Sequence, residues 1–222
     1  MRAGIIEFPG SGGAPALAAV LRAAGHETVS IWHDDQELPD VDALYLPSGA
    51  SYGDHLRPGA VAARTRIMAA VRSAADAGLP VLGFGNGFQV LTEAGLLPGA
   101  LLQNDCLHFV CRDTRVVPQA ADSPWLRGMK AGTPLRLPVA HGFGRYTADA
   151  ATLAELGQSG RIAFRYAQGS NPAGSQADIA GVLSADGNVL GLMPLPDRAT
   201  DALTGSKDGL GILLAPLQGA EA

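Results

Sequence analysis

Short apolar runs alternate with amphipathic stretches along the first half of this chain, and that alternation most constrains its fold. Apolar runs at 3–8, 43–46 and 80–84 are each followed by glycine or proline, and stretches with helical spacing lie at 15–24 and 59–77. Strands buried on both faces have continuous apolar sequences, and parallel neighbours need a crossover helix between them. The pattern therefore predicts an α/β fold with a mostly parallel central sheet flanked by helices.

Beyond Leu101 the helical spacing gives way to short apolar runs separated by turns, such as Asp-Gly-Asn at 186–188. Runs joined in this way are typical of β-hairpins, so additional antiparallel strands are expected beside the parallel sheet. The runs cover residues 107–117, 135–140, 179–183 and 189–193. No internal repeat or long linker divides the chain, and its 222 residues fit a single domain over 1–222.

The composition excludes several classes of protein. Hydrophobic residues make up 47% and charged residues 17%, which indicates a chain that buries a sizeable core. The net charge of -5 and the lack of a Lys/Arg cluster argue against a nucleic-acid partner. No apolar run approaches the ~20 residues that span a bilayer, and the first residues do not have the pattern of a signal peptide. We therefore expect a cytoplasmic protein with no membrane partner.

Neither a metal nor a cofactor is expected. Cys106 and Cys111 lie five residues apart in a segment, 105–111, that has the pattern of a strand. An odd offset places them on opposite faces of a strand, so we expect two unrelated buried thiols rather than a disulfide or a metal site. The glycine-rich run at 10–13 resembles a phosphate cradle, but no lysine follows it, so no nucleotide site is expected.

The most specific motif in the chain follows the strand expected at 80–84. The sequence Gly-Phe-Gly-Asn-Gly-Phe-Gln at 83–89 lies between that strand and a helix expected at 90–94. Alternate glycines permit a nucleophile elbow, a strained strand-to-helix turn that exposes its central residue and points helix amides at a developing oxyanion. Active sites of open α/β sheets form at the carboxyl ends of the strands. We therefore expect a site centred on Gly85.

This motif is similar to the elbow Gly-x-Cys-Asn-Gly-Phe-Gln of the glutaminase subunits of phosphoribosylformylglycinamidine synthase, which are class I glutamine amidotransferases of purine biosynthesis. The likeness continues through most of the chain, in the segments 8–11, 46–57, 92–101, 104–112, 140–146 and 179–181. The resemblance implies a flavodoxin-like, mostly parallel sheet in one type 1 amidotransferase-like domain. It also implies two partners, a large ATP-dependent synthetase subunit and glutamine or another small ligand.

The positions of that family's catalytic residues carry other residues here. The nucleophilic cysteine falls on Gly85, and the family's Pro-His-Pro-Glu segment reads Pro-Leu-Pro-Asp at 194–197. In the family, the cysteine attacks the side-chain amide of glutamine, the histidine transfers protons and the glutamate orients the histidine. Gly85 and Leu195 have no group for these tasks, and only Asp197 keeps a suitable one. The resemblance therefore implies that no catalytic triad is intact. Phe143 likewise falls on an acidic residue of the family.

Other positions of the family's site keep residues that suit it. The resemblance implies that Gly49 supplies an oxyanion-hole amide and that Ser51 and Gln89 contact the substrate. It further implies contacts with the pocket or with a partner at Tyr52, Asp54, Arg57, Asn86, His141, Phe143 and Arg145. The residues themselves leave structural roles open, because 47–49 has the sequence of a turn and a histidine that ends a strand is commonly held by local hydrogen bonds.

Three functions follow from these observations. We expect the first, a glutaminase-deficient docking or scaffold subunit for an ATP-dependent synthetase that uses free ammonia or another amine. The second is an active amidotransferase or hydrolase whose nucleophile is another residue, for which Ser51, His141 and the two cysteines are candidates. The third is a sensor that binds a small apolar ligand in a pocket enlarged by Gly85 and lined by Leu195 and Phe143.

Overall fold

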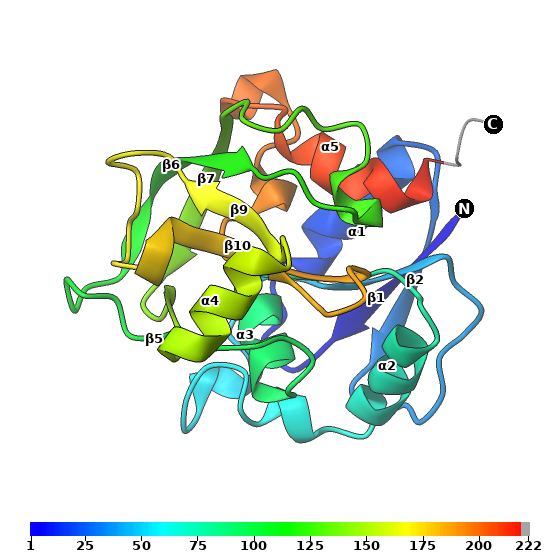
Figure 1. Ribbon diagram of the computed structural model, residues 1–222. Coiled ribbons are helices and arrows are strands. Elements are labelled where there is room, and N and C mark those ends of the chain that lie inside the picture. Colours follow the sequence, from blue (N-terminus) through cyan, green and yellow to red (C-terminus); the bar gives the residue numbers. More distant parts are fainter. Residues whose placement is uncertain (219–222) are drawn as a thin grey trace.

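One mixed sheet of nine strands, in the order β2-β1-β3-β4-β11-β10-β9-β6-β7, forms the centre of the computed structural model, which describes residues 1–218 (Figure 1). The strands are β1 (Arg2–Glu7), β2 (Glu27–Trp32), β3 (Ala43–Leu46), β4 (Val81–Phe84), β6 (Val110–Pro118), β7 (Leu135–His141), β9 (Ile162–Tyr166), β10 (Ile179–Leu183) and β11 (Val189–Leu192). A separate antiparallel pair consists of β5 (Ala100–Leu102) and β8 (Arg145–Thr147). The expected fold class is confirmed, and the last four residues of the domain predicted over 1–222 lie outside the described residues.

Within residues 1–218, five α-helices cover the two faces of this sheet. They are α1 (Ala14–Ala23), α2 (Ile67–Asp76), α3 (Asn86–Glu93), α4 (Ala150–Gln158) and α5 (Gly209–Leu214). In Figure 1, α1 and α5 lie above the sheet and α2, α3 and α4 lie below it. Leu17 of α1 and Leu213 of α5 belong to one buried cluster, whereas Val71 of α2 and Phe88 of α3 belong to the other. Every residue of β3, β4 and β11 is buried, which explains their continuous apolar sequences.

The strand directions bring most of the motif-bearing loops to one end of the sheet. β1, β2, β3, β4 and β11 run parallel, so they all end at the edge where β4 meets the expected elbow. β10 runs antiparallel to both β11 and β9, and β6 runs antiparallel to both β9 and β7. Consequently β9 and β7 also end at this edge, and β6 and β10 begin there. We call it the elbow edge.

Two predicted helices have different bounds in the structure. The stretch 59–77 is not one helix, because a short 3-10 helix (Ala62–Arg64) ends at Thr65 before α2 begins. The Thr65 hydroxyl donates to the carbonyl of Ala62 at 2.7 Å, which offers the backbone an alternative to a continuous helix. The helix expected at 90–94 instead begins at Asn86, directly after Gly85.

The prediction of a strand over 105–111 with two buried thiols is wrong. Residues 105–109 form a turn, and β6 begins only at Val110. The side-chain amide of Asn104 donates to the carbonyl of His108 at 2.9 Å, and Leu107 has a φ of +60°, so the chain folds back on itself before the strand. Cys106 and Cys111 are both free thiols and both are exposed.

Candidate active site at the elbow edge

The turn between β4 and α3 has the geometry of a nucleophile elbow. Gly85 has φ +54° and ψ -116°, and its amide donates to the carbonyl of Leu192 at 2.9 Å, so the ladder with β11 continues to the turn. The carbonyl of Gly85 accepts from the amides of Phe88 and Gln89 and so starts α3 at once. This backbone conformation is unfavourable for residues with a Cβ and costs glycine little.

The glycines on either side of Gly85 permit close packing of the turn. A Cβ on Gly83 would lie 2.5 Å from the carbonyl oxygen of Gly87, and one on Gly87 would lie 1.9 Å from the carbonyl oxygen of Leu46 in β3. The first turn of α3 can therefore rest directly on the ends of β3 and β4. These contacts explain the alternation of glycines in the motif, which the sequence alone could only associate with a turn.

Leu195 occupies the space beside the apex of the elbow. A Cβ on Gly85 would lie 2.8 Å from Cδ2 of Leu195 and 3.2 Å from Cβ of Ser48. Leu195 is itself only 7% exposed. The absence of a side chain at Gly85 thus leaves no open volume at that point, contrary to the enlarged pocket on which the sensor hypothesis depended. Neither Gly85 nor Leu195 offers a nucleophile, an acid or a base at the apex.

Asp197 is a buried carboxylate in the 3-10 helix that follows Leu195 (Pro196–Arg198). Neither of its oxygens has a hydrogen-bond partner within the described chain. The nearest cation, Nε of Arg198, lies 3.5 Å from Oδ2 and belongs to a side chain that is half exposed. Burial raises the pKa of Asp197 to about 6, and the Arg198 guanidinium and the nearby backbone amides of Asp197 and Arg198 offset part of that rise. A carboxylate without hydrogen-bond partners is costly in this environment.

This burial predicts a pH-dependent effect of Asp197→Asn on stability. In the unfolded chain the pKa of an aspartate is ~3.9, so the folded chain binds the proton more tightly. The contribution of Asp197 is therefore fully present below about pH 4 and is lost as the pH rises to about 6. A pKa difference of this size between the folded and the unfolded chain corresponds to about 3 kcal/mol of unfolding free energy. We expect the free energy of unfolding of Asp197→Asn, relative to the natural chain, to increase by about that amount between pH 4 and pH 7.5.

Urea unfolding at both pH values measures this difference directly. The cost of burying the asparagine amide is the same at both pH values, so it cancels from the change in the stability difference. Burial lowers the pKa of His141 to about 4, so its contribution to the free energy of unfolding increases as the pH rises. That increase is common to both proteins. A difference between the proteins that stays constant across this range would show that Asp197 titrates normally and would contradict the burial argument.

A chain of buried amides connects the loop after β3 to α3 and to the loop after β7. The amide of Ser51 donates to Oδ1 of Asn86 at 3.0 Å, and Nδ2 of Asn86 donates to Oε1 of Gln89 at 2.9 Å. Nε2 of Gln89 then donates to the carbonyl of Phe143 at 2.7 Å. Ser51, Asn86 and Gln89 are each no more than 6% exposed. The structure thus brings together four of the residues predicted for the site.

His141 is held by Asn104, a residue whose importance the sequence did not reveal. Nδ2 of Asn104 donates to the carbonyls of His108 and His141, each at 2.9 Å, which fixes the orientation of the amide. In this orientation Oδ1 of Asn104 accepts from the amide of Gly144. Because an amide oxygen can only accept, Nδ1 of His141, at 3.0 Å from Oδ1, must donate to it. Nε2 of His141 is left unprotonated, buried and without a partner among residues 1–218. Because burial lowers its pKa to about 4, His141 is neutral at pH 7.

The remaining predicted residues lie at the elbow edge but make local contacts. Nη2 of Arg57 pairs with Glu93 at the end of α3, at 2.6 Å. The hydroxyl of Tyr52 is 2.8 Å from Nδ1 of His33, beyond the end of β2. Asp54 is exposed. Arg145 pairs with Asp105 at 2.5 Å. Gly49 is exposed and rests on the loop after β1, where a Cβ would lie 2.4 Å from the carbonyl oxygen of Gly10.

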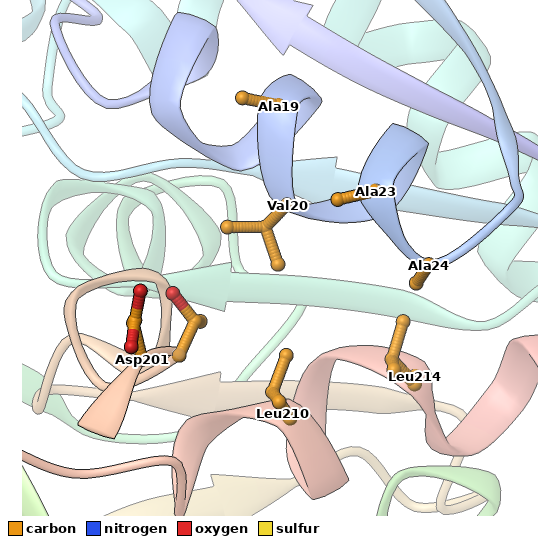
Figure 2. Close-up of a pocket in the computed structure, with 8 residues that line it drawn as sticks. Ala19, Val20, Ala23, Ala24, Asp201, Leu210 and Leu214 are labelled. Atoms are coloured by element: carbon orange, nitrogen blue, oxygen red, sulfur yellow. The ribbon is translucent and has the colours of Figure 1, made fainter. Parts of the chain in front are cut away.

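No metal or membrane feature accompanies this site. Residues 1–218 contain no cluster of three or more His, Cys, Asp or Glu side chains that could hold a metal ion. In the same part of the chain, no helix is long and apolar enough to cross a membrane. A mainly apolar cavity of about 420 Å³ lies between α1 and α5, where Val20 points toward Leu210 and Leu214 (Figure 2). Gly85 and Leu195 do not line it.

The elbow keeps its strained backbone and the first-turn amides of α3, which favour a negatively charged group. The resemblance implies that Leu195 stands at the position of the family's histidine, but nothing in the sequence indicates that it fills the space at the apex. Asn104 begins one of the segments that resemble the family, but its hydrogen bond to His141 could not be predicted, since an asparagine before a strand is ordinary in a turn.

Comparisons with known proteins agree with this architecture. The family of the CobB/CobQ-like glutamine amidotransferase domain matches residues 1–208. The phosphoribosylformylglycinamidine synthase subunit PurQ of Rubrobacter xylanophilus is 55% identical over 222 residues and covers all of both chains. The same subunit of Frankia casuarinae is 52% identical over 219 residues, covering 98% of this chain and 94% of the relative.

Solved structures give the same result. The structure of PurLQS from Thermotoga maritima contains a chain that matches with a TM-score of 0.89 and 40% identity, over 97% of both chains. The glutaminase domain of Trypanosoma brucei CTPS shares only the fold, with a TM-score of 0.63 and 14% identity over 98% of this chain and 94% of that one. The chain therefore belongs to the CobB/CobQ-like glutamine amidotransferase family, and the PurQ subunits are among its relatives in that family.

Proposed function

We propose that this chain is a glutaminase-deficient relative of the PurQ subunits that acts as a docking or scaffold subunit for an ATP-dependent synthetase in purine biosynthesis. The relatives at 55% and 52% identity are named as subunits of phosphoribosylformylglycinamidine synthase. The related Thermotoga maritima chain belongs to a structure titled PurLQS, which supports association with other subunits. The partner proposed here is the large synthetase subunit.

One observation carries the proposal that glutamine is not hydrolysed. Gly85 stands at the apex of the elbow, where the resemblance places the nucleophilic cysteine, and Leu195 fills the adjoining space. By the same resemblance Leu195 takes the place of the histidine that transfers protons. An amidotransferase needs an atom that can attack the amide carbon at about 3–3.5 Å and a base beside it. Without the nucleophile and the base, only the rate enhancement that a binding pocket provides would remain.

The burial of Asp197 supports the same conclusion. In a catalytic triad, the buried carboxylate accepts a hydrogen bond from the histidine that it orients, and this hydrogen bond offsets the cost of its burial. The carboxylate of Asp197 is buried and has no hydrogen-bond partner in the described part of the chain. The residue therefore fits the proposal of a triad that has lost its other two members, with the third still in its place.

The nitrogen source of the reconstituted complex tests this function. We expect the chain to co-elute with the large synthetase subunit of the same organism. In the presence of ATP and formylglycinamide ribonucleotide, the complex should form product with ammonium chloride and show no turnover above background with glutamine. Product formation from glutamine, with an equal amount of glutamate released, would refute the proposal, and so would a failure of the two subunits to associate.

A second candidate, hydrolysis by another residue, has a specific observation in its favour. The hydroxyl of Ser51 and Nε2 of His141 are both buried and have no hydrogen-bond partner among the described residues, and the hydrogen-bonded chain through Asn86 and Gln89 connects their loops. Unpartnered groups of this kind are also found at active sites. If glutamine were hydrolysed, Ser51→Ala and His141→Ala would each abolish the activity, and this result would favour the second candidate.

A further inference from the structure

Charged side chains lie on the solvent-facing side of one part of the sheet. β6 lies between β7 and β9 (Figure 1). Thr114 and Val116 of β6 are buried, whereas Asp113 and Arg115 alternate with them and are exposed. Arg136 of β7 is exposed in the same way. Because alternate residues of a strand point to opposite faces, these charged side chains share the outer face of the two strands.

Two arginines lie directly opposite each other on this outer face. The register of the antiparallel pair of β6 and β7 places Arg115 against Arg136. The Cβ atoms of such a pair are about 5 Å apart, and like charges in these positions destabilise a sheet. Asp113 compensates only one of the two charges, because its Oδ2 accepts from Nε of Arg136 at 2.9 Å and also from Nη2. The side chain of Arg115 has no hydrogen bond or ion pair within residues 1–218.

A third arginine belongs to the same outer face. Arg165 of β9 lies opposite Val117 of β6, which is two residues from Arg115 and points to the same side. Diagonal neighbours of this kind have Cβ atoms about 7–8 Å apart, within the reach of long side chains. Nη1 of Arg165 donates to the carbonyl of Ala177. Three adjacent strands therefore each bring one guanidinium group to this face.

A cavity of about 320 Å³ opens beside Arg115. Two hydrogen bonds tie the loop after β9 to β6 at this place. The Thr114 hydroxyl donates to the carbonyl of Ser170 at 2.7 Å, and the amide of Ala167 donates to the carbonyl of Arg115 at 2.8 Å. The lining residues are Asp113, Thr114, Arg115, Arg136 and Ser170. The loop that carries Ser170 is thus held as one wall of a cavity that two arginines also line.

The charges around this cavity favour an anionic ligand. A second carboxylate, Asp208, lies nearby, and its Oδ2 accepts from the backbone amide of Arg136 at 2.7 Å. Both carboxylates contact Arg136, so an anion that accepts hydrogen bonds from Arg115 would relieve the repulsion between the opposed arginines. A phosphate group suits donors from several strands, because its oxygens are arranged tetrahedrally, whereas a carboxylate presents two oxygens in one plane.

We propose that the cavity beside Arg115 binds a phosphate group, as inorganic phosphate or as part of a phosphorylated small molecule. The site is separate from the candidate active site, since Arg136 precedes His141 by five residues, or about 17 Å, along β7. The inference does not depend on whether glutamine is hydrolysed at the elbow edge. A bound phosphate would stabilise the pairing of β6 and β7, because it lies between their opposed arginines.

Titration with inorganic phosphate at constant ionic strength, followed by phosphorus NMR, tests the site. We expect the natural chain to bind phosphate saturably at one site. Arg115→Gln should weaken this binding about 10-fold or more, because a charge-assisted hydrogen bond is lost. Arg115→Lys keeps the charge but not the two-pronged geometry, so its affinity should lie between the two. Arg127→Gln is the matched control and should bind like the natural chain, because Arg127 is exposed and does not line the cavity.

Melting temperatures give a second readout. Without phosphate, Arg115→Gln should be at least as stable as the natural chain, since it removes one member of a like-charge pair. Phosphate should raise the melting temperature of the natural chain more than that of Arg115→Gln. A lower melting temperature of Arg115→Gln without phosphate would contradict the argument from opposed charges.

Ribose 5-phosphate and ADP identify the source of the phosphate group. Binding of either compound about 10-fold more tightly than inorganic phosphate would assign the site to a phosphorylated small molecule, and equal or weaker binding would assign it to inorganic phosphate. The proposal would be overturned if none of the three compounds bound saturably to the natural chain, or if Arg115→Gln bound them as tightly as the natural chain does.

Discussion

The double variant Gly85→Cys/Leu195→His should release glutamate from glutamine at least about 10³-fold faster than the natural chain, because removal of triad members costs enzymes of this kind that much or more. Cys at the apex of the elbow would supply the attacking atom, and His two residues before Asp197 would supply the base. The buried carboxylate of Asp197, which has no hydrogen-bond partner within residues 1–218, is positioned in sequence to orient that histidine. The elbow itself already has the required strained backbone.

Both substitutions are needed for this gain. In Gly85→Cys alone, the new Cβ would lie 2.8 Å from Cδ2 of Leu195 and no base would be present. We expect that single variant to be inactive and to lose about 1–3 kcal/mol of stability through backbone strain. Leu195→His alone should be inactive because it lacks a nucleophile. Equal activity in the double variant and the natural chain would mean that the rest of the pocket has also lost the ability to bind or cleave glutamine.

Gly87→Ala should be the most damaging small substitution near the site. The added Cβ would lie 1.9 Å from the carbonyl oxygen of Leu46, and both groups belong to backbone that cannot move independently. Forcing α3 away from β3 should cost about 3 kcal/mol or more of the free energy of unfolding. For a domain of this size, that loss lowers the melting temperature by about 6–12 °C, which differential scanning calorimetry measures.

Gly157→Ala provides the matched control for that substitution. Gly157 lies within α4, and a Cβ there would meet no atom within 4 Å. Alanine is favoured over glycine inside helices, so this variant should gain about 0.5 kcal/mol. If Gly87→Ala were as stable as Gly157→Ala, the close contact between α3 and β3 described here would be wrong.

Local sequence patterns predicted those parts of the fold that local physics determines. The apolar runs of β3, β4 and β11 indicated strands buried on both faces, and the glycines at 83, 85 and 87 indicated the elbow. The same patterns failed where a single side-chain hydrogen bond decides the structure. Asn104 folds residues 105–109 into a turn through the carbonyl of His108, although the residue types in this segment favour a strand.

The sequence predicted which residues belong to the candidate site, but it did not predict their mutual contacts. Ser51, Asn86, Gln89 and Phe143 were all assigned to it through family resemblance. The hydrogen bonds that join them connect two separate loops to one helix, so no spacing in the sequence encodes them. The position of Leu195 against Gly85 depends likewise on how the segment after β11 packs, which only the tertiary structure reveals.

The most direct test of the central claim is the release of glutamate by the natural chain in complex with the large synthetase subunit, ATP and formylglycinamide ribonucleotide. The Gly85→Cys/Leu195→His variant, measured in the same complex, provides the positive comparison. We predict no glutamate above the background of the synthetase alone, while the complex remains associated. Catalytic release of glutamate by the natural chain would contradict the account and would assign the attack to a residue other than the one at the apex of the elbow.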